Sequence, residues 1–531
     1  MYPMIQDFES FTLTEALFPM PDGVGLYTRL LVPKGGGQYP IVFIRTPYSQ
    51  AYKGKPCPLD ENLEVPYIRH GYAVVLQHCR GTGDSQGICI PYKHERSDAL
   101  ETLSMLRKLP FYNGEIYLLG GSYLATVHFS YLDPCPPDIK GAALSIQTDR
   151  MFFRNYRNGC CYNFCNLSWW LRMMQRQYPD GRVKAETLPP RPYKDLMKNL
   201  VGEDVPDYTA NLLNDTYNEF WQNDPRTNVI ENWKIPVLFT EGWYDFYIEG
   251  MFSMWQRLPE EAKKKSAFVV GPWGHATKTA KNCPYPLPEG DIPADFALQW
   301  FNSIRLGTPY PHAKTGKVNY YSIGGGKWYT GDDPRPACGI RKLYFRENLT
   351  LSDTPCRTDG TVTYEYDPEK APGCFRHHGI YKGAAPNTVP GVISFLSDPA
   401  AEEQRFYGPV HWQMTVSSDC EDTAFFIRVY LVEGGESFNL TDTVTSLSHT
   451  DPHCRAGKAV TLELDTPPIA FTLKKGAAIR VDISSHSDIY VPHANIKGHW
   501  AEVTETRIAH NTLHLKNAHI TLPADPRVSP E

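Results

Sequence analysis

The sequence predicts an α/β fold with an open, mostly parallel sheet, followed by a separate all-β domain. Two observations lead to this prediction. In the first part of the chain, short apolar runs of strand length alternate with segments of helical periodicity, which is typical of parallel strands joined by crossover helices. In the last part, apolar and polar residues alternate with a period of two, and glycine and proline separate the runs. A chain of 531 residues is long enough for two or three domains.

The expected parallel strands are apolar throughout, because helices cover both faces of such a sheet. They are PIVFIR (40–45), YAVVLQ (72–77), EIYLLG (115–120), GAALSI (141–146), IPVLFT (235–240) and SAFVVG (266–271). Helical periodicity occupies the stretches 94–109, 123–132 and 247–258, and 295–307 is expected to be the closing helix.

The stretch 147–233 contains no strand-like run and is rich in aromatic residues, so we expect a helical cap inserted over one end of the sheet. Beyond it, the alternating runs VNYYSIG, KLYFRE, TVTYEYD, FFIRVYLV, VTLELD and AIRVDISS predict a C-terminal β-sandwich or jelly roll. The predicted α/β domain comprises residues 1–146 and 234–313. The cap is expected at 147–233 and the β domain at 314–531.

Composition excludes several classes of function. The net charge of -6 offers no basic surface for a phosphate backbone, so no nucleic-acid partner is expected. No apolar run reaches the length of a membrane helix and no charged start of a secretory signal is present, so the cytoplasm is the expected location. The thirteen cysteines lack CxxC spacing, and Cys160, Cys161 and Cys165 have no histidine at zinc-finger spacing. We therefore expect reduced thiols, no metal and no cofactor; a homodimer is left open.

Polar residues follow four of the predicted strands. Ser122 follows EIYLLG, Asp245 follows IPVLFT, His275 follows SAFVVG, and Tyr48 follows PIVFIR. The carboxyl ends of parallel strands lie at one edge of a sheet, where catalytic groups of α/β proteins are usually found. Serine, aspartate and histidine occur in the chain order of the α/β-hydrolases. In such a set the imidazole takes the proton of the serine hydroxyl and the carboxylate orients the imidazole.

Each of these residues also has an ordinary explanation. Ser122 and Asp245 could cap the helices that follow them, and His275 could be a loop histidine. In addition, the turn GGSYL matches the GxSxG motif only in part, because Leu124 stands in place of the second glycine. The joint placement of the three residues in the required order favours catalysis.

A second glycine-rich segment, HCRGTGDSQG (78–87), also follows a strand. The spacing of Gly81, Gly83 and Gly87 is one residue too long for GxGxxG, so a nucleotide site is not expected. Ser85 is a weaker candidate nucleophile than Ser122. A tight loop beside the active site explains the segment better.

Five segments together resemble the CocE/NonD family of serine hydrolases. In chain order they are RTPY (45–48), GYAVVLQHCRGTGDSQG (71–87), GGSY (120–123), GWYD (242–245) and GPWGH (271–275). The resemblance spans nearly the whole chain and continues in the β region with YEYDP, ISFLSDP and KKGAAIRVDISSHS. It implies an α/β-hydrolase domain with an inserted helical cap and a C-terminal jelly roll.

The resemblance also implies roles for individual residues. By matching motif, Ser122 is the nucleophile, His275 the general base and acid, and Asp245 the carboxylate that orients it. The family likewise implies an oxyanion hole formed by the hydroxyl of Tyr48 and the backbone N–H of Tyr123. The implied activity is hydrolysis of small acyl esters or amides through an acyl-enzyme. One departure is Ala125, which stands where the family usually has glycine.

Aromatic residues near the site are candidates for the substrate pocket, although they could equally belong to the core. They are Phe152, Phe153, Trp169, Trp170 and Phe246.

Substrate preference is expected from a missing acidic cluster. The α-amino-acid ester hydrolases of the family bind an α-ammonium group with carboxylates, but this chain offers Arg154, Asn155 and the stretch 246–248, none of them acidic, at the corresponding places. Neutral acyl or aryl esters are therefore expected to be preferred. The alternatives are an X-Pro dipeptidyl-peptidase, an α-amino-acid ester hydrolase or acylase, and a silent hydrolase scaffold whose β domain binds carbohydrate or protein.

Overall fold

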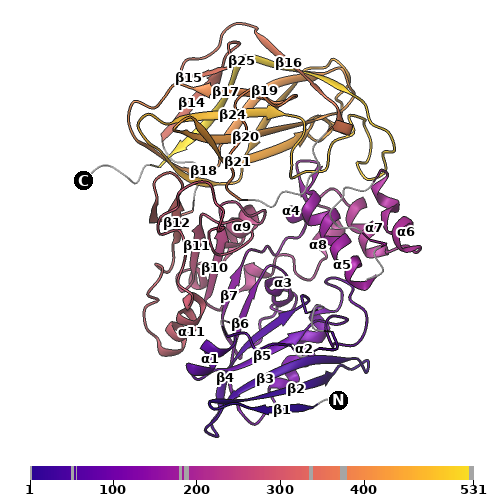
Figure 1. The fold of residues 1–531 in the computed structure, drawn as a ribbon, viewed down its shortest axis with the longest axis vertical. Helices are drawn as coiled ribbons and strands as arrows, with labels where there is room; N and C mark the ends of the chain where they lie inside the picture. The colour runs from indigo at the N-terminus through magenta and orange to yellow at the C-terminus, as the bar shows by residue number, and fades with distance from the viewer. Residues whose placement is uncertain are drawn as a thin grey trace.

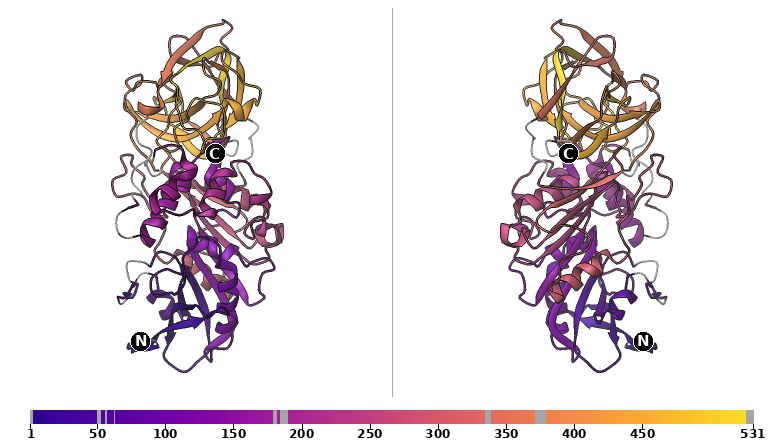
Figure 2. Two further views of the ribbon diagram at one scale, coloured as in Figure 1. Left: turned by 90° about the vertical axis from the view of Figure 1, so that its right-hand side faces the viewer. Right: turned by 90° about the vertical axis from the view of Figure 1, so that its left-hand side faces the viewer.

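The computed structural model describes residues 3–49, 53–55, 57–61, 63–178, 182–183, 190–333, 339–370 and 379–525. The α/β sheet and the β domain follow one another along the longest axis of the molecule, and the cap helices lie beside the sheet below the β domain (Figures 1 and 2). None of the helices in these ranges is both long and apolar enough to cross a membrane. The cysteines within the same ranges form no disulfide bonds.

An 11-stranded mixed sheet forms the first part of the molecule, with the order β1-β2-β3-β5-β4-β6-β7-β10-β11-β12-β13. All six predicted parallel strands are present in it. The parallel strands are β4 (Tyr39–Thr46), β5 (Ala73–His78), β6 (Tyr112–Gly121), β7 (Ile139–Ser145), β10 (Val237–Gly242), β11 (Ala267–Gly271) and β12 (Val318–Ser322). Antiparallel strands complete the two edges: β1 (Met4–Asp7), β2 (Phe11–Pro19), β3 (Gly25–Pro33) and β13 (Lys327–Gly331).

Helices cover both faces of this sheet, which explains why its central strands are apolar throughout. In β4, for example, Ile41 and Phe43 pack into one hydrophobic cluster, whereas Val42 and Ile44 pack into another on the opposite face. The helices of this part are α1 (Val65–Arg69), α2 (Glu95–Leu106), α3 (Tyr123–Phe129), α9 (Ile248–Arg257), α10 (Glu260–Lys263) and α11 (Phe296–Leu306).

Two features of the sheet differ from the sequence-based expectation. Strands β1 to β3, which precede the first predicted strand, were not anticipated. The run VNYYSIG (318–324) was assigned to the β domain, but β12 pairs in parallel with β11 and β13 follows it, so the α/β sheet continues past the expected boundary at 314. The alternation of polar and apolar residues in this run suggests a half-exposed strand, but its polar residue Asn319 is buried. The Asn319 side chain bonds to the backbone of Lys314 and Phe268 instead of facing solvent.

The cap is built from short helices around its own cluster of aromatic and aliphatic side chains. A short hairpin joins the first cap helix to the next. The cap elements are α4 (Phe152–Asn155), β8 (Tyr156–Arg157), β9 (Cys160–Cys161), a π-helix (Asn163–Ser168), α5 (Trp169–Gln177), α6 (Leu196–Val201), α7 (Pro206–Leu213), α8 (Glu219–Gln222), and 3-10 turns at Tyr193–Asp195 and Val229–Asn232.

The C-terminal part is the predicted all-β domain, a 12-stranded and mostly antiparallel sheet. Its long last strand, β25, pairs with β14, β16, β18 and β19 and so joins the two sides of a nearly closed barrel. The domain also contacts the cap, because Asn163 donates a backbone hydrogen bond to Ile489 and Val491 donates one to Cys161.

The elements of the β domain are β14 (Gly339–Phe345), β15 (Thr350–Ser352), β16 (Thr361–Tyr366), β17 (Ile393–Ser397), β18 (Gln404–Gly408), β19 (His411–Ser418), β20 (Ala424–Glu433), β21 (Glu436–Ser446), α12 (Leu447–Thr450), β22 (Val460–Asp465), β23 (Ile469–Leu473), β24 (Ala478–Ser484) and β25 (Ala509–Ala524), with a 3-10 turn at Pro368–Lys370.

Candidate active site

Ser122 lies on a sharp turn between β6 and α3. Its backbone has φ 56° and ψ -127°, a conformation that L-residues rarely adopt, and its side chain makes no helix-capping hydrogen bond. The two preceding glycines allow the turn to be this tight. A Cβ added to Gly120 would come within 2.3 Å of the carbonyl oxygen of Leu124, and one added to Gly121 within 2.7 Å of Ser145 Oγ. The turn therefore presents the Ser122 hydroxyl, and the simple capping explanation does not hold.

A chain of hydrogen bonds joins the three residues that the sequence singles out. His275 Nε2 is 2.9 Å from Ser122 Oγ, and His275 Nδ1 is 2.6 Å from Asp245 Oδ2. The Asp245 side chain has no exposed surface, whereas that of His275 is 23% exposed. The carboxylate is thus fixed in the interior, and the serine end of the chain faces the solvent-accessible side.

The loops that carry Asp245 and His275 interlock through their backbones. Trp243 donates a hydrogen bond to Gly271, and Tyr244 donates one to Trp273. The backbone N–H of Tyr247 donates to Asp245 Oδ1 over 2.8 Å, which leaves Oδ2 for the histidine.

A second buried carboxyl group, that of Glu241, lies on the same segment. It is fully buried, and its Oε1 accepts the N–H of Gly242. Among the residues that the structure describes, its buried Oε2 has no hydrogen-bond partner. Burial raises the pKa of Glu241 well above its ordinary value, and the nearby charge of Asp245 raises it further. We infer that Glu241 stays protonated at neutral pH.

We expect Glu241→Gln to increase stability at alkaline pH and to leave kcat close to that of the wild type. In the unfolded chain the carboxyl ionises near pH 4.3, but in the native state it keeps its proton to much higher pH. The free energy of unfolding of the wild type therefore falls as the pH rises through that interval, and a neutral amide avoids the loss.

Urea unfolding at pH 5 and pH 8 measures this effect. The stability of the variant relative to the wild type should improve by at least about 1 kcal/mol between the two pH values. If the relative stability is the same at both pH values, Glu241 is ionised in the native protein.

The side chains of Tyr48 and Tyr123, the two expected oxyanion donors, are in contact with each other. The ring of Tyr48 is 39% exposed and meets the ring of Tyr123 edge-on, with centroids 6.3 Å apart. Tyr123 is the first residue of α3, so its N–H has no carbonyl acceptor within the helix. Its phenol points the other way: it is buried, donates to Glu95 Oε1 over 2.8 Å and accepts from the N–H of Tyr92.

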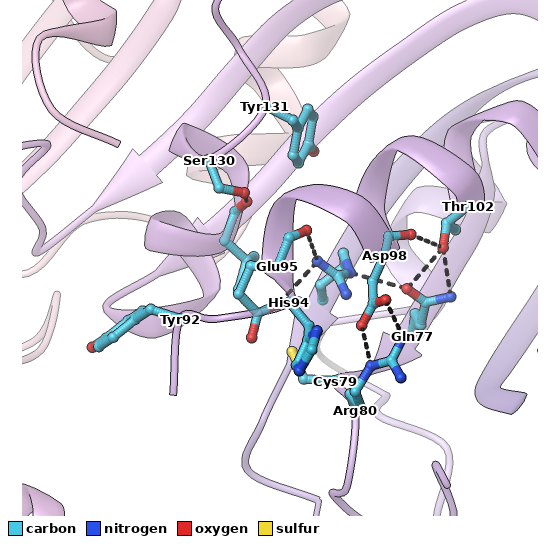
Figure 3. A network of polar contacts seen from close by, with 12 residues as sticks. Gln77, Cys79, Arg80, Tyr92, His94, Glu95, Asp98, Thr102, Ser130 and Tyr131 are labelled. Atoms are coloured by element: carbon cyan, nitrogen blue, oxygen red, sulfur yellow. Dashed lines mark hydrogen bonds and ion pairs between the residues drawn. The ribbon is translucent and has the colours of Figure 1, made fainter. Parts of the chain in front are cut away.

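Glu95, which accepts the hydrogen bond from the Tyr123 phenol, belongs to a buried polar network (Figure 3). Arg45, the first residue of the RTPY segment, bonds to Glu95 Oε2 over 3.0 Å and to Gln77 Oε1 over 2.9 Å. In Figure 3, Arg80 and Asp98 point toward each other beside Gln77, and their ion pair measures 2.6 Å. The arginines of the RTPY and HCRG segments therefore connect β4 and the loop after β5 to α2.

The glycine-rich loop after β5 is a tight turn, and its serine is occupied. Ser85 Oγ donates to the carbonyl of His78 and accepts the N–H of Tyr27. Gly81 has φ 69°, and an added Cβ would lie 2.2 Å from the backbone nitrogen of Cys89. The loop thus requires glycine for its own geometry, and Ser85 is a structural residue.

The five aromatic pocket candidates fall into two groups. Phe246 stacks on the ring of His275, with centroids 4.8 Å apart, and Trp169 stacks on Tyr123 over 6.0 Å. The ring contacts of the other three are with cap residues. They are Phe152 with Tyr156, Tyr217 and Trp221, Phe153 with Phe152 and Tyr217, and Trp170 with Trp169 and Tyr208.

Three residues near the site were not proposed from the sequence as parts of it. Tyr92 stacks on both Tyr123 and Trp169, and the ring of Tyr247 lies 5.8 Å from that of His275. The guanidinium of Arg154 lies over the ring of Trp169. The sequence position of Tyr247, two residues after Asp245, could have indicated that it lies near the site. No sequence pattern indicates this for Tyr92, which lies in a loop far from Ser122 in sequence.

Two protein-family models match most of this chain. Residues 22–277 match the model of the X-Pro dipeptidyl-peptidase family (S15 family), and residues 312–521 match that of the X-Pro dipeptidyl-peptidase C-terminal non-catalytic domain. The chain belongs to the CocE/NonD family of hydrolases. The protein is therefore an S15/cocaine esterase family hydrolase, of a kind that acts on esters or peptides.

Individual relatives cover nearly the whole chain. The cocaine esterase of Rhodococcus sp. (strain MB1 Bresler) is 23% identical over 96% of this chain and 98% of its own length. An aminopeptidase from a marine sediment Thaumarchaeota archaeon and an α-amino acid ester hydrolase each superpose with a TM-score of 0.81 at 18% identity, covering 99% of this chain and 98% of theirs. A CocE/NonD family hydrolase from Staphylococcus aureus superposes with a TM-score of 0.68 at 16% identity, over 97% of this chain and 94% of its own. At these identities the superpositions show a shared fold.

Proposed function

We propose that this CocE/NonD family protein is a serine hydrolase that cleaves acyl esters, and more slowly amides, through an acyl-enzyme on Ser122. The observation that carries the proposal is the hydrogen-bond chain from Ser122 Oγ through His275 to the buried Asp245. The strained turn at Ser122 fits the same function.

The proposed reaction follows from the atoms of this chain. His275 Nε2 takes the proton of the Ser122 hydroxyl as Oγ attacks the acyl carbonyl, and Asp245 Oδ2 stabilises the imidazolium through its bond with Nδ1–H. The imidazolium then gives its proton to the leaving alcohol or amine, and the acyl group remains on Oγ. A water molecule, deprotonated by the same imidazole, releases the acid and restores the serine.

The negative charge of the tetrahedral intermediate needs donors that are already in place. The N–H of Tyr123 is available at the start of α3, and the proposed second donor is the hydroxyl of Tyr48, whose ring is exposed and contacts that of Tyr123. The burial of Glu95 and Arg45 behind Tyr123 keeps that side of the turn rigid.

A serine-directed fluorophosphonate separates this function from that of a silent binding scaffold. We expect the purified protein to hydrolyse p-nitrophenyl esters, to lose that activity as the probe reacts, and to carry the adduct on the peptide containing Ser122. The proposed chemistry uses no metal, so turnover should survive EDTA. If the protein is not labelled and hydrolyses none of a panel of esters and anilides, the binding scaffold is favoured. If the adduct is found on Ser85, that residue and not Ser122 is the nucleophile.

We expect Tyr48→Phe to lower kcat by about 10²- to 10³-fold with little change in KM, because it removes one oxyanion donor and keeps the ring. Steady-state kinetics on a p-nitrophenyl ester measure both constants, and a melting curve checks the fold. Tyr39→Phe is a matched control, since Tyr39 lies at the opposite end of the same strand. A rise in KM with kcat unchanged would make Tyr48 a substrate-binding residue instead.

A further inference from the structure

Gln147 is a buried amide side chain that bonds directly to the backbone of the proposed nucleophile. It is 1% exposed and follows the end of β7 by two residues. Its Nε2 donates to the carbonyl oxygen of Ser122 over 2.8 Å, and its Oε1 accepts the backbone N–H of Thr148 over 2.8 Å. Because a backbone N–H can only donate, the amide atom that faces Thr148 is the oxygen, and the nitrogen must face Ser122.

The carbonyl that Gln147 contacts belongs to the strained residue of the turn. Ser122 has a φ of 56°, and a strained conformation of this kind persists only where the surrounding structure holds it. The N–H of Ser122 donates to Ser145, the last residue of β7, over 3.0 Å. The carbonyl of Ser122 also accepts the N–H of Ala125 in α3. The chain around the end of β7 therefore binds both backbone polar groups of Ser122.

The segment that carries Gln147 is itself fixed on the side of the proposed triad aspartate. Strand β7 lies between β6 and β10 in the sheet. The N–H of Ile146 donates to Thr240 in β10 over 3.0 Å, and Ile146 has a φ of 48°, which is rare for a β-branched residue. Thr148 packs against α9 so closely that a Cβ added to Gly250 would lie 2.5 Å from its own Cβ. Gln147 thus projects from a rigid segment between the nucleophile strand and the aspartate strand.

We infer that Gln147 is a positioning residue for the proposed nucleophile: its bond to the Ser122 carbonyl holds the turn at the angle that directs Oγ to His275. This inference rests on the proposed serine hydrolase function. Without the bond, the strained turn can relax toward an ordinary backbone conformation, and Oγ moves with it. A displacement of about 1 Å at a reacting atom can slow a reaction about 100-fold, so the loss should appear in kcat.

A buried amide that bonds to the backbone can also serve stability alone, and the chain offers a matched control for that role. Asn319 is 8% exposed and lies on β12, beyond β11 in the same sheet. Its side chain bonds to the backbone of Lys314 and Phe268. Replacing either amide by an apolar side chain leaves buried backbone groups without partners and should lower stability. Only the change at Gln147 should alter kcat.

Gln147→Met keeps the length of the side chain and removes both of its hydrogen bonds. We expect kcat on a p-nitrophenyl ester to fall by about tenfold to a hundredfold while KM stays within about threefold of the wild type. The second-order rate constant for fluorophosphonate labelling should fall by a similar factor, because the probe also needs a correctly placed Oγ. Asn319→Leu should keep kcat within about threefold, although its melting temperature falls.

Gln147→Glu provides a second test that retains the shape of the side chain. When protonated, its carboxyl group can donate to Ser122 O and accept the N–H of Thr148, as the amide does. Buried glutamates reach pKa values of about 8 to 9, so ionisation should be complete by about pH 9.5 and should remove the donor. We expect kcat relative to the wild type to fall at least about tenfold between about pH 5.5 and about pH 9.5. Groups that both proteins share cancel in this ratio, and melting curves at each pH check the fold.

The outcomes separate this inference from the function on which it rests. If the wild type is labelled and turns over esters but Gln147→Met keeps its kcat, or raises KM alone, the positioning role is overturned and the hydrolase remains. An equal loss of kcat in Asn319→Leu would overturn it as well. If Gln147→Met does not fold, the pH dependence of Gln147→Glu decides, and a constant ratio contradicts the inference. No labelling and no turnover by the wild type would contradict the proposed function itself.

Discussion

Ser122→Ala should lower kcat by about 10³-fold or more on every substrate, because without Oγ no acyl-enzyme can form. The side chain contributes little else: its hydroxyl bonds to His275, and the turn is held by the backbone bond from Ser122 N to Ser145 O and by the glycines before it. KM and the melting temperature should therefore stay close to those of the wild type.

The measurement combines single-substrate kinetics with labelling. Ser122→Ala should fail to react with a fluorophosphonate that labels the wild type completely. Ser130→Ala is the control, since that serine is the C-cap of the same helix and its hydroxyl donates to the backbone carbonyl of Val127. Turnover near the wild-type rate by a correctly folded Ser122→Ala protein would rule out Ser122 as the nucleophile.

The sequence could predict that Ser122, Asp245 and His275 lie together because each of them follows its own strand. The period of the apolar runs locates β6, β10 and β11, and the carboxyl ends of parallel strands must meet at one edge of the sheet. Ser122 and His275 are therefore brought together although 153 residues separate them. Chain order and strand position are sufficient to predict that these side chains meet, because the fold brings the ends of their strands to one edge of the sheet.

Other features depend on pairings that no local pattern encodes. Arg45 and Glu95 are 50 residues apart and meet only because α2 packs beside β4. The strand β12 looked half-exposed because Asn319 interrupts its apolar run, although that side chain is buried among backbone partners.

The sequence likewise shows that Arg154 is not acidic, but not that it lies buried over Trp169 without a carboxylate partner in the described residues. Whether Arg154 has a carboxylate partner depends on which of the surrounding acids are already paired, as Glu249 is with Arg157. That is a property of the packed cap.

Asp245→Asn should lower kcat by about 10³- to 10⁴-fold with little change in KM, through the tautomer of His275. The backbone N–H of Tyr247 donates to Oδ1 over 2.8 Å, so the amide oxygen of the variant keeps that place and its NH₂ group faces His275 Nδ1. An amide donor there makes Nδ1 an acceptor, and the ring proton moves to Nε2. Nε2–H then points at Ser122 Oγ and cannot take the serine proton.

Glu241→Gln is the matched control for this effect, since it also converts a buried carboxyl group of the same segment into an amide. Glu241 bonds to the N–H of Gly242 and has no hydrogen bond to His275. Glu241→Gln therefore removes a buried carboxyl group without touching His275, and kcat should not fall. Asp245→Asn removes the acceptor of the bond from His275 Nδ1, and kcat should fall. Steady-state kinetics of both variants on one ester measure the difference, with melting curves to check the fold. If Asp245→Asn stays within about tenfold of the wild type, another group orients His275 and the proposed role of Asp245 fails.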